Sequence, residues 1–419
     1  MLDLKRIRQD PDGVRDALAR RGKGFAEIVD KVLERDEAWR TATTSAEGLR
    51  ARQRTLGPAQ ALASSKGQPS PQLRSELKQI SDRVKQLTDV ANLAKRELDA
   101  LLLPLPNLPD PSAAPGPEDE LVRTVGEPPA FAFEPRDHLD LAGSRIDMER
   151  AARLSGSRFA YLKGDLVLVE LALVRWTLDI MGAHGFEPVI PPVLVREQAL
   201  YGTGFLPDTE KQIYSLPEDD LHLVGTSEVA LASLHADEIL EEDALPLRYA
   251  GFSPCFRREA GAAGKDTRGI FRVHQFDKVE MFSFVSPADS ASEHERILAI
   301  EEQILQELEL PYRVVNIAVS DLGNSAAKKY DCEAWLPSYD AYRELTSCSN
   351  TTDYQARRLN VRVRAERGTE PPHTLNGTAV AVGRTLVALL ENGQQADGSV
   401  QLPNVLTPYG APARLEPAV

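Results

Sequence analysis

Apolar residues recur at alternating steps of four and three over two stretches near the N-terminus. The first runs from Ile28 to Leu56, and the second, from Leu73 to Leu101, has an apolar residue at every expected position. This spacing is typical of helices that pack as a coiled coil. The segment between them, SSKGQPSP (residues 64–71), is rich in residues that end helices. The pattern predicts an antiparallel hairpin of two helices, each of roughly 35 residues and about 50 Å long.

A proline-rich stretch follows the hairpin. The segment LPNLPDPSAAPGPED (residues 105–119) carries too many prolines for a helix or a central strand. We expect a linker over residues 104–125, between a helical domain at 1–103 and a second domain at 126–419. The length of 419 residues also suggests more than one domain.

The second domain alternates between helical and strand-like patterns. A long apolar helix is predicted over residues 165–184, and the segment FEPVIPPVLV after it holds prolines that suit an edge strand or an interface. An apolar run ending at Phe256 and the segment 270–285 are expected to be strands. Residues 376–394 are predicted to form a glycine-bearing strand that turns into a helix at Gly383.

Charge is unevenly distributed along the chain. The net charge is −14, but residues 1–103 hold 20 Lys and Arg against 15 Asp and Glu. A basic N-terminal arm can dock a polyanion although the whole protein is acidic. The pattern alone leaves two alternatives open: an arm that grips RNA by backbone and shape, and a coiled coil for dimerisation or spacing.

Composition sets the broad class of protein. Hydrophobic residues make up 42% and charged residues 27%, which is ordinary for a globular chain. The charged start predicts no signal peptide, and no apolar run is long enough for a membrane span. The three cysteines, at 255, 332 and 348, form no CxxC pair. We therefore expect reduced thiols, a cytoplasmic location and no structural zinc.

The segment FRREAGAAGKDTRGIFRVHQFDKVE (residues 256–280) carries the clearest chemistry. Arg257 and Glu259 would share one face of a strand. The arginine suits a phosphate or carboxylate, and the glutamate can accept from an amino group such as that of adenine. Lys265 and Arg268 add positive charge to the following loop, although a salt-bridged surface hairpin would look similar. The whole string resembles motif 2 of class II aminoacyl-tRNA synthetases, in the form found in seryl-tRNA synthetases.

Three other segments carry polar residues that suit the same ligands. In LVGTSEVALA, Thr226 and Glu228 can receive an ammonium group, although a helix N-cap is equally compatible with the local sequence. In ELTSCSN, beginning at Glu344, hard oxygen ligands suit Mg²⁺, although a polar turn is the simpler interpretation. Arg384 stands at a helix start, where the dipole disfavours a cation, so its position indicates function rather than stability.

Other nucleotide-binding folds fit poorly. The segment GAAGKDT (residues 261–267) is too short for a P-loop and lacks its hydroxyl residue, and Gly202 and Gly204 form a GxG without a third glycine. An antiparallel sheet that carries the three polar segments is the remaining candidate for an ATP site.

The resemblance to seryl-tRNA synthetases covers nearly the whole chain. Motif 1 would lie at about 165–195, motif 2 at about 247–285 and motif 3 at about 376–395. It implies an α+β fold, in which an antiparallel coiled-coil arm precedes a catalytic domain built on an antiparallel β-sheet flanked by helices. It also implies a homodimer, with no membrane partner, that activates L-serine with Mg·ATP. The seryl group would pass to tRNA(Ser), and to tRNA(Sec) where present.

The resemblance also assigns residues. The serine site would comprise Thr226, Ser227, Glu228, Arg257, Glu280, Asn376 and Thr378. The ATP site would comprise Arg257, Arg258, Glu259, Val273, Glu344, Leu345, Thr346, Ser347 and Arg384. Mg²⁺ would bind Glu344 and Ser347 together with the nucleotide. The tRNA contacts would come from Arg50, Arg52, Arg54, Lys66, Arg74 and Lys78.

Two alternatives remain at this point. A synthetase paralogue that loads a carrier protein would share the activation site, but it has no need of a long basic arm. A coiled-coil scaffold or RNA-binding protein with a decayed synthetase domain would not keep Arg257, Glu259, Glu344 and Arg384 together. Amino-acid-dependent pyrophosphate exchange and tRNA charging distinguish all three.

Overall fold

The computed structural model describes residues 1–418, apart from 23, 67–69, 208–209, 261–265 and 267. The described residues form two compact units, residues 2–105 and residues 106–419, with Met1 assigned to the second. In this described part of the chain no helix is both long and apolar enough to cross a membrane.

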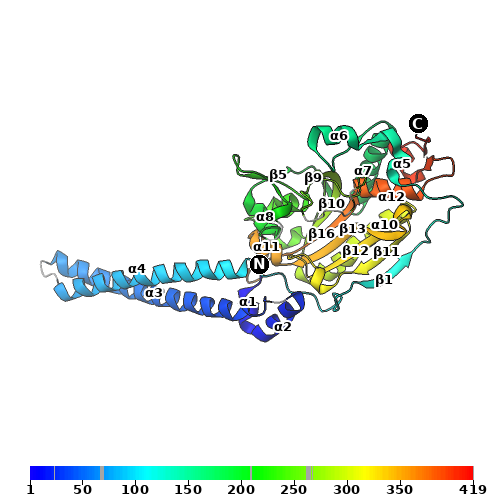
Figure 1. Ribbon diagram of the computed structural model, residues 1–419. Helices are drawn as coiled ribbons and strands as arrows, with labels where there is room; N and C mark the ends of the chain where they lie inside the picture. The colour runs from blue at the N-terminus through cyan, green and yellow to red at the C-terminus, as the bar shows by residue number, and fades with distance from the viewer. Residues whose placement is uncertain (23, 67–69, 208–209, 261–265, 267, 419) are drawn as a thin grey trace. The chain divides into compact units, whose positions relative to one another are not determined.

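The first unit is helical. Two short helices, α1 (Leu4–Gln9) and α2 (Pro11–Arg21), precede the long helices α3 (Ile28–Ser65) and α4 (Pro71–Leu102). Figure 1 shows α3 and α4 side by side along their length. Their direction is antiparallel, because Arg35 pairs with Glu97 at 3.2 Å whereas Arg50 donates to Thr88 at 3.0 Å. The predicted helical hairpin is therefore confirmed.

Small apolar residues lie at the predicted core positions of both α3 and α4. Ala42 and Ala46 of α3 and Ala91 and Ala94 of α4 are buried. Asp36 is also buried, and it pairs with Arg40 at 2.8 Å and with Arg8 of α1 at 3.4 Å. Because its partner outside α3 is Arg8, Asp36 is buried on the side of α3 that meets α1.

The second unit is built on an eight-stranded sheet. The strands, in spatial order, are β1 (Glu120–Val125), β11 (Tyr312–Asn316), β12 (Lys328–Leu336), β13 (Ala341–Thr352), β16 (His373–Ala381), β10 (Gln275–Val285), β9 (Leu247–Phe256) and β4 (Glu187–Val189). All neighbouring pairs are antiparallel except β4 and β9, which are parallel. The predicted α+β fold is confirmed, and the proline-bearing β4 lies at the edge, where its missing N–H costs no ladder bond.

The remaining elements cover or extend this sheet. The helices are α5 (His138–Ala142), α6 (Met148–Ser155), α7 (Asp165–Ala183), α8 (Glu197–Thr203), α9 (Glu228–Ala232), α10 (Ser290–Glu307), α11 (Tyr354–Arg358) and α12 (Val382–Asn392). The small strands are β2 (Ile146–Asp147), β3 (Tyr161–Leu162), β5 (Leu194–Val195), β6 (Tyr214–Leu216), β7 (Leu221–Leu223), β8 (Ile239–Leu240), β14 (Arg362–Ala365), β15 (Gly368–Glu370), β17 (Val400–Gln401) and β18 (Arg414–Leu415).

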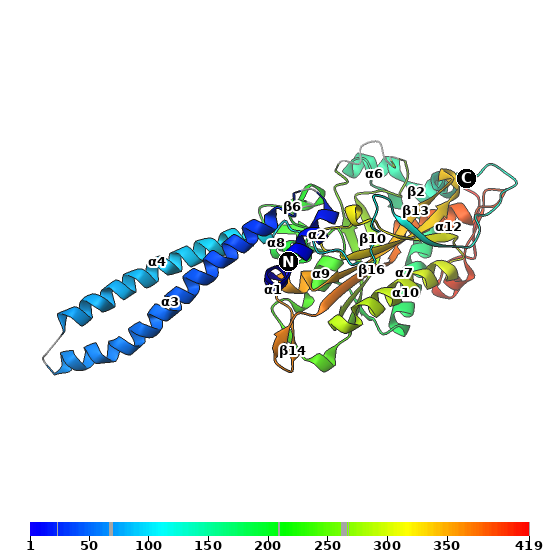
Figure 2. The same ribbon diagram turned by 90° about the horizontal axis from the view of Figure 1, so that it is seen from below.

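The two faces of the sheet have different tasks. Along β10, Val279 and Met281 point into the core that α7 and α10 cover, and the residues between them point to the other face. Figure 2 shows α10 lying along the sheet. Gly377 of β16 faces α10 so closely that a Cβ atom would lie 2.4 Å from Cγ2 of Ile297. Helix α10 thus covers one face of the sheet, and polar side chains can gather on the opposite face.

Three local boundaries differ from the sequence predictions. Strand β9 ends at Phe256, so Arg257 and Glu259 follow it, and Glu259 turns the chain with a φ of +50°. Strand β10 begins at Gln275 rather than at residue 270. Residues 120–125, expected in the linker, form edge strand β1. Asn107, also expected in the linker, is buried because its amide donates to the carbonyls of Ser325 and Thr351.

Candidate active site

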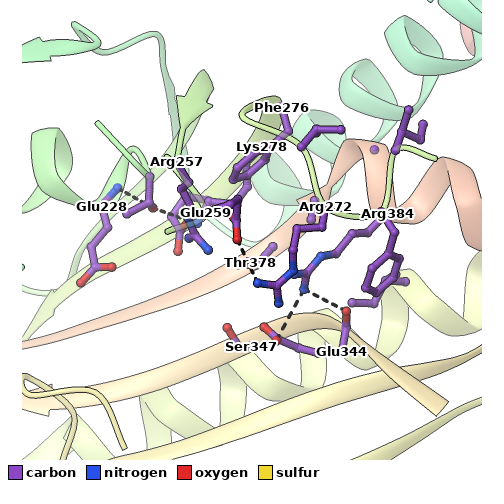
Figure 3. A pocket seen from close by; sticks show the side chains of 18 of the residues that line it. Glu228, Arg257, Glu259, Arg272, Phe276, Lys278, Glu344, Ser347, Thr378 and Arg384 are labelled. Carbon is purple, nitrogen blue, oxygen red and sulfur yellow. Dashed lines mark hydrogen bonds and ion pairs between the residues drawn. The ribbon is translucent and has the colours of Figure 1, made fainter. Parts of the chain in front are cut away.

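A cavity of about 150 Å³ lies on the face of the sheet opposite α10. Its walls come from strands β10, β13 and β16, from the residues that follow β9, and from the start of α12. Figure 3 shows charged side chains from these elements pointing toward one another. Segments as far apart in sequence as those of Phe205 and Arg384 therefore share one site.

One end of the cavity gathers two carboxylates and their hydrogen-bond partners. The hydroxyl of Thr226 donates to Glu280 at 2.9 Å and accepts from the backbone N–H of Glu228 at 3.2 Å. The amide of Asn376 donates to Glu228 at 3.2 Å and to Glu280 at 3.4 Å. All but Asn376 are buried. This arrangement suits a small ligand with an ammonium group and a hydroxyl group.

Burial changes the protonation chemistry of this end. Burial raises the pKa of Glu228 above its ordinary value, against the hydrogen bond from Gln355 at 2.8 Å and the charges of Lys278 and Arg257. A carboxylate in this condition gains from an arriving cation, because the cation supplies the charge compensation that water provides elsewhere. The site therefore favours an ammonium ligand over a neutral one.

The opposite end is lined by arginines and aromatic rings. Nε of Arg257 donates to the carbonyl of Gly225 at 3.1 Å, and its guanidinium lies 5.4 Å from the ring centre of Phe276. Glu259 accepts from Arg272 at 2.9 Å. Guanidinium groups that are held beside aromatic rings can bind phosphates and stack on a flat base.

Arg384 and Glu344 close the cavity on a third side. Arg384 donates to the carbonyl of Glu344 at 3.0 Å and lies 3.5 Å from its carboxylate, with Phe271 stacked 4.9 Å from the guanidinium. Burial disfavours the charged form of Glu344, but Arg384, Lys329 and Arg257 outweigh it and hold the pKa below its ordinary value. The carboxylate is therefore ionised and able to serve as a metal ligand.

A β-bulge brings Glu344 and Ser347 to the same face. The pairing of β12 and β13 shifts between Cys332 and Glu333, whose partners are Thr346 and Glu344, so Leu345 is the extra residue. Side chains three apart then point the same way. One carboxylate and one hydroxyl fit Mg²⁺ that takes its other ligands from phosphates and water. Among the described residues there is no cluster of three or more His, Cys, Asp or Glu that would hold a metal alone.

The cavity collects most of the residues predicted from the sequence. Those that line it are Thr226, Glu228, Arg257, Glu259, Val273, Glu280, Glu344, Leu345, Ser347, Asn376, Thr378 and Arg384. Ser227, Arg258 and Thr346 do not. Ser227 is buried and donates to the carbonyl of Gly251, Arg258 is exposed, and Thr346 donates to Glu301 on the helix-covered face.

Several lining residues were not predicted. They are Phe205, Ile270, Phe271, Arg272, Phe276, Lys278, Ala381 and Gly383. Phe276 and Lys278 stand four and two residues before Glu280 on one strand, so the period-two alternation of β10 was a usable signal for both. Arg272 lies in a segment without regular structure, where no such signal exists.

Two groups of basic residues were also expected to bind an anion. The basic loop expected at 261–269 falls mostly outside the described residues, and within the rest of it Arg268 pairs with Asp137 and Asp140. The six basic residues assigned to the arm are all exposed. Arg52 pairs with Glu76 across the hairpin.

Comparison with known proteins places the chain in a family. Residues 213–393 match the tRNA synthetase class II core domain (G, H, P, S and T), and residues 1–109 match the seryl-tRNA synthetase N-terminal domain. A serine–tRNA ligase of Streptomyces coelicolor is 52% identical over 100% of this chain and 99% of its own length. One of Acidothermus cellulolyticus is 51% identical over 98% of each.

Solved structures agree with this placement. The seryl-tRNA synthetase of Pyrococcus horikoshii, complexed with ATP, is 41% identical, with a TM-score of 0.94 over 100% of both chains. The sheet and its cavity are thus those of a class II aminoacyl-tRNA synthetase. With the matching N-terminal domain and relatives of about 50% identity, the chain belongs to the seryl-tRNA synthetases, which are ATP-dependent serine–tRNA ligases.

Proposed function

We propose that the cavity binds L-serine at its carboxylate end and ATP at its arginine end, and that seryl-adenylate forms between them. The observation that carries this proposal is the pair of buried carboxylates, Glu228 and Glu280, in the same cavity as Arg257 and Glu259. Thr226 and Glu228 receive the serine ammonium. Glu280 and Thr378 hold the hydroxyl.

Substrate alignment supplies most of the catalysis in this scheme. Arg257 holds the serine carboxylate beside the α-phosphate, Glu259 accepts from the adenine amino group, and Arg384 contacts adenine and the γ-phosphate. The reacting atoms are then held in line, and fixed cations balance the charge that develops on phosphorus. No side chain forms a covalent bond with the substrate. The seryl group afterwards passes to the 3′-terminal adenosine of tRNA(Ser).

Selectivity for serine follows from the same polar groups. Alanine would leave Glu280 and Thr378 without the hydroxyl that they bind, and buried polar groups without partners are costly. Among the described residues the cavity end is enclosed by Thr226, Asn376 and the two carboxylates. We therefore propose that serine is selected by binding at this site.

Mg²⁺ forms part of the proposal. Glu344, whose carboxylate is ionised, and Ser347, which shares its face, would hold the ion together with the nucleotide. When bound, the ion neutralises phosphate charge. The protein's own part is to orient the two oxygens through the bulge at Leu345.

The quaternary structure and the RNA partner belong to the proposal as well. We propose a homodimer through α7, and tRNA binding by the exposed basic residues of the arm. The resemblance extends the second point to tRNA(Sec) in an organism that has one. A cytoplasmic location is supported by three cysteines that are buried and free.

Serine-dependent exchange of pyrophosphate into ATP tests the proposed site. We expect exchange with serine, at least 100-fold less with alanine, and a loss of about 100-fold or more in the Arg384→Ala and Glu280→Gln enzymes, because each removes a charged contact. Arg414→Ala is a suitable control, since Arg414 pairs with Asp397 outside the cavity. Full exchange in either site variant contradicts the assigned roles. Exchange without tRNA charging would instead favour transfer to a carrier protein.

A further inference from the structure

Lys278 stands at the centre of the cavity and has no role in the proposed scheme. It lies on β10 between Phe276 and Glu280, at two-residue steps, and all three line the cavity. Phe276 belongs to the nucleotide end and Glu280 to the serine end. The lysine therefore occupies the middle of the strand, level with the place where serine and the α-phosphate must meet.

The ammonium of Lys278 is deeply buried. The residue is 6% exposed, and its nitrogen is ion-paired with Glu280. The other charged and titratable groups that act on it are Cys255 of β9, Arg257 after β9, Glu228 at the start of α9 and Glu344 of β13. Across the ladder on β16 stands uncharged Ala381. Figure 3 shows the lysine among these cavity side chains.

Serine binding competes with the ion pair between Lys278 and Glu280. Glu280 already accepts from Thr226 and Asn376 and pairs with Lys278, so a serine hydroxyl reaches a carboxylate that three donors already crowd. Thr226 and Asn376 are fixed on short side chains, whereas a lysine ammonium moves on a flexible four-carbon stem. Lys278 is thus the donor that can leave.

A buried ammonium that leaves one carboxylate needs another anion. An unpaired charge in a buried site costs several kcal/mol. The two other carboxylates that act on it are already engaged: Glu228 accepts from Gln355 and Asn376, and Glu344 pairs with Arg384. The anions that arrive with the substrates are the serine carboxylate and the α-phosphate, which meet beside Lys278.

We propose that Lys278 is a catalytic residue: its ammonium balances Glu280 in the empty enzyme and turns to the carboxylate–α-phosphate junction when serine binds. This inference rests on the proposed function. In the step that it assists, a serine carboxylate oxygen forms a bond to the α-phosphorus. The bond from that phosphorus to the bridging oxygen of pyrophosphate breaks, and pyrophosphate leaves with the electron pair. Lys278 keeps its proton throughout and stabilises the added negative charge.

Pyrophosphate exchange by Lys278→Met and Lys278→Arg enzymes tests the proposal. We expect kcat of Lys278→Met to fall by about 100-fold or more, as for the loss of one preorganised donor. The serine KM should change less than about threefold, because the ammonium acts mainly on the charge that develops at the junction in the transition state. Lys278→Arg, which keeps the charge, should stay within about tenfold of the wild type. Lys163→Met is the matched control, since Lys163 also pairs with a carboxylate, Asp147, but outside the cavity.

A purely structural role would give a different result. If Lys278 only neutralised Glu280, the Glu280→Gln change would remove the need for it, and Lys278→Met would then be harmless in that background. We expect the same loss of kcat in both backgrounds. Should Lys278→Met fail to fold, Lys278→Gln in the two backgrounds removes the charge but keeps a polar side chain, and the same losses of kcat are expected. The proposal is overturned if Lys278→Met keeps kcat within threefold, if Lys278→Arg loses as much as Lys278→Met, or if KM rises as far as kcat falls.

Absence of serine-dependent exchange in the wild type would reject the proposed function itself.

Discussion

At the scale of single residues, Glu344 on the cavity face and Glu301 on the helix-covered face have pKa values shifted in opposite directions. On the cavity face Glu344 is held ionised by neighbouring cations. On the helix-covered face Glu301 of α10 is fully buried, and burial raises its pKa well above the ordinary value. Its Oε2 accepts from Thr346 at 3.0 Å, and its Oε1 has no hydrogen-bond partner. Burial therefore favours the protonated, neutral form of Glu301.

Because burial favours the protonated form of Glu301, we expect substitution by glutamine to raise the thermal stability, and to raise it more at higher pH. In the unfolded chain Glu301 ionises above its ordinary pKa, whereas the folded chain keeps the proton, so its contribution to stability is lost as pH rises. Glutamine keeps the acceptor for Thr346 without this proton linkage. We expect Tm of Glu301→Gln to exceed that of the wild type at pH 8, by about 1–2 °C for each kcal/mol, and the difference to shrink toward pH 5.

Thermal unfolding at a series of pH values measures this difference. Glu309→Gln is a control, because Glu309 is exposed on the loop after α10. A Tm difference between Glu301→Gln and wild type that is constant with pH would contradict a protonated Glu301.

At the scale of elements, the sequence predicted strands better than it predicted where their side chains point. The family resemblance assigned Glu280, and the two-residue alternation along β10 would have added Lys278 on the same face. The bulge at Leu345 turns Thr346 to the helix-covered face. The sequence of β13 alone does not predict this bulge, because a bulge depends on how the partner strand pairs. The position of Arg272 also depends on the tertiary fold, since it lies outside regular structure.

Helix α7 carries an exposed apolar stripe. Leu168 and Leu171 are 49% and 57% exposed, and they lie three residues apart on the face of the helix away from the core. Ile190 and Leu194, which follow in the expected motif 1, are exposed as well. Large apolar side chains gathered on one face indicate an interface.

The α7 stripe predicts that Leu171→Asp weakens the proposed dimer. A twofold interface loses the contact twice, and burying one leucine contributes about 1.5–3 kcal/mol, so the dimer Kd should rise by at least about 100-fold. Sedimentation equilibrium measures it, with the wild type expected at about twice the chain mass of 46.1 kDa. Leu62→Asp, at an arm residue that is also 57% exposed, serves as the control. A dimer unaffected by Leu171→Asp would place the interface elsewhere.

At the scale of the whole molecule, the cavity and the basic arm belong to different units. Every residue that lines the cavity belongs to the unit of residues 106–419. The basic arm belongs to the unit of residues 2–105, and it holds a surplus of Lys and Arg while the rest of the chain is acidic. Serine activation should therefore be independent of the arm, and tRNA charging should depend on it.

Deletion of residues 47–87, with a short Gly-Ser linker between Ala46 and Thr88, separates these activities. The deletion removes Arg50, Arg52, Arg54, Lys66, Arg74 and Lys78 together. We expect kcat/KM for tRNA charging to fall by about 100-fold or more, because each lost phosphate contact removes counterion release that favours binding. Serine-dependent pyrophosphate exchange should stay within about twofold of the wild type.

Substitution of the same six residues by glutamine, in an arm of full length, distinguishes charge from shape. If phosphate contacts dominate, tRNA charging by this variant should fall nearly as far as in the deletion, and it should lose most of the salt dependence of tRNA binding. Full charging by the glutamine variant would indicate that the arm acts by shape alone. Equal loss of charging and exchange in the deletion would reject the arm as a tRNA-binding element, because an arm that binds only tRNA has no part in adenylate formation.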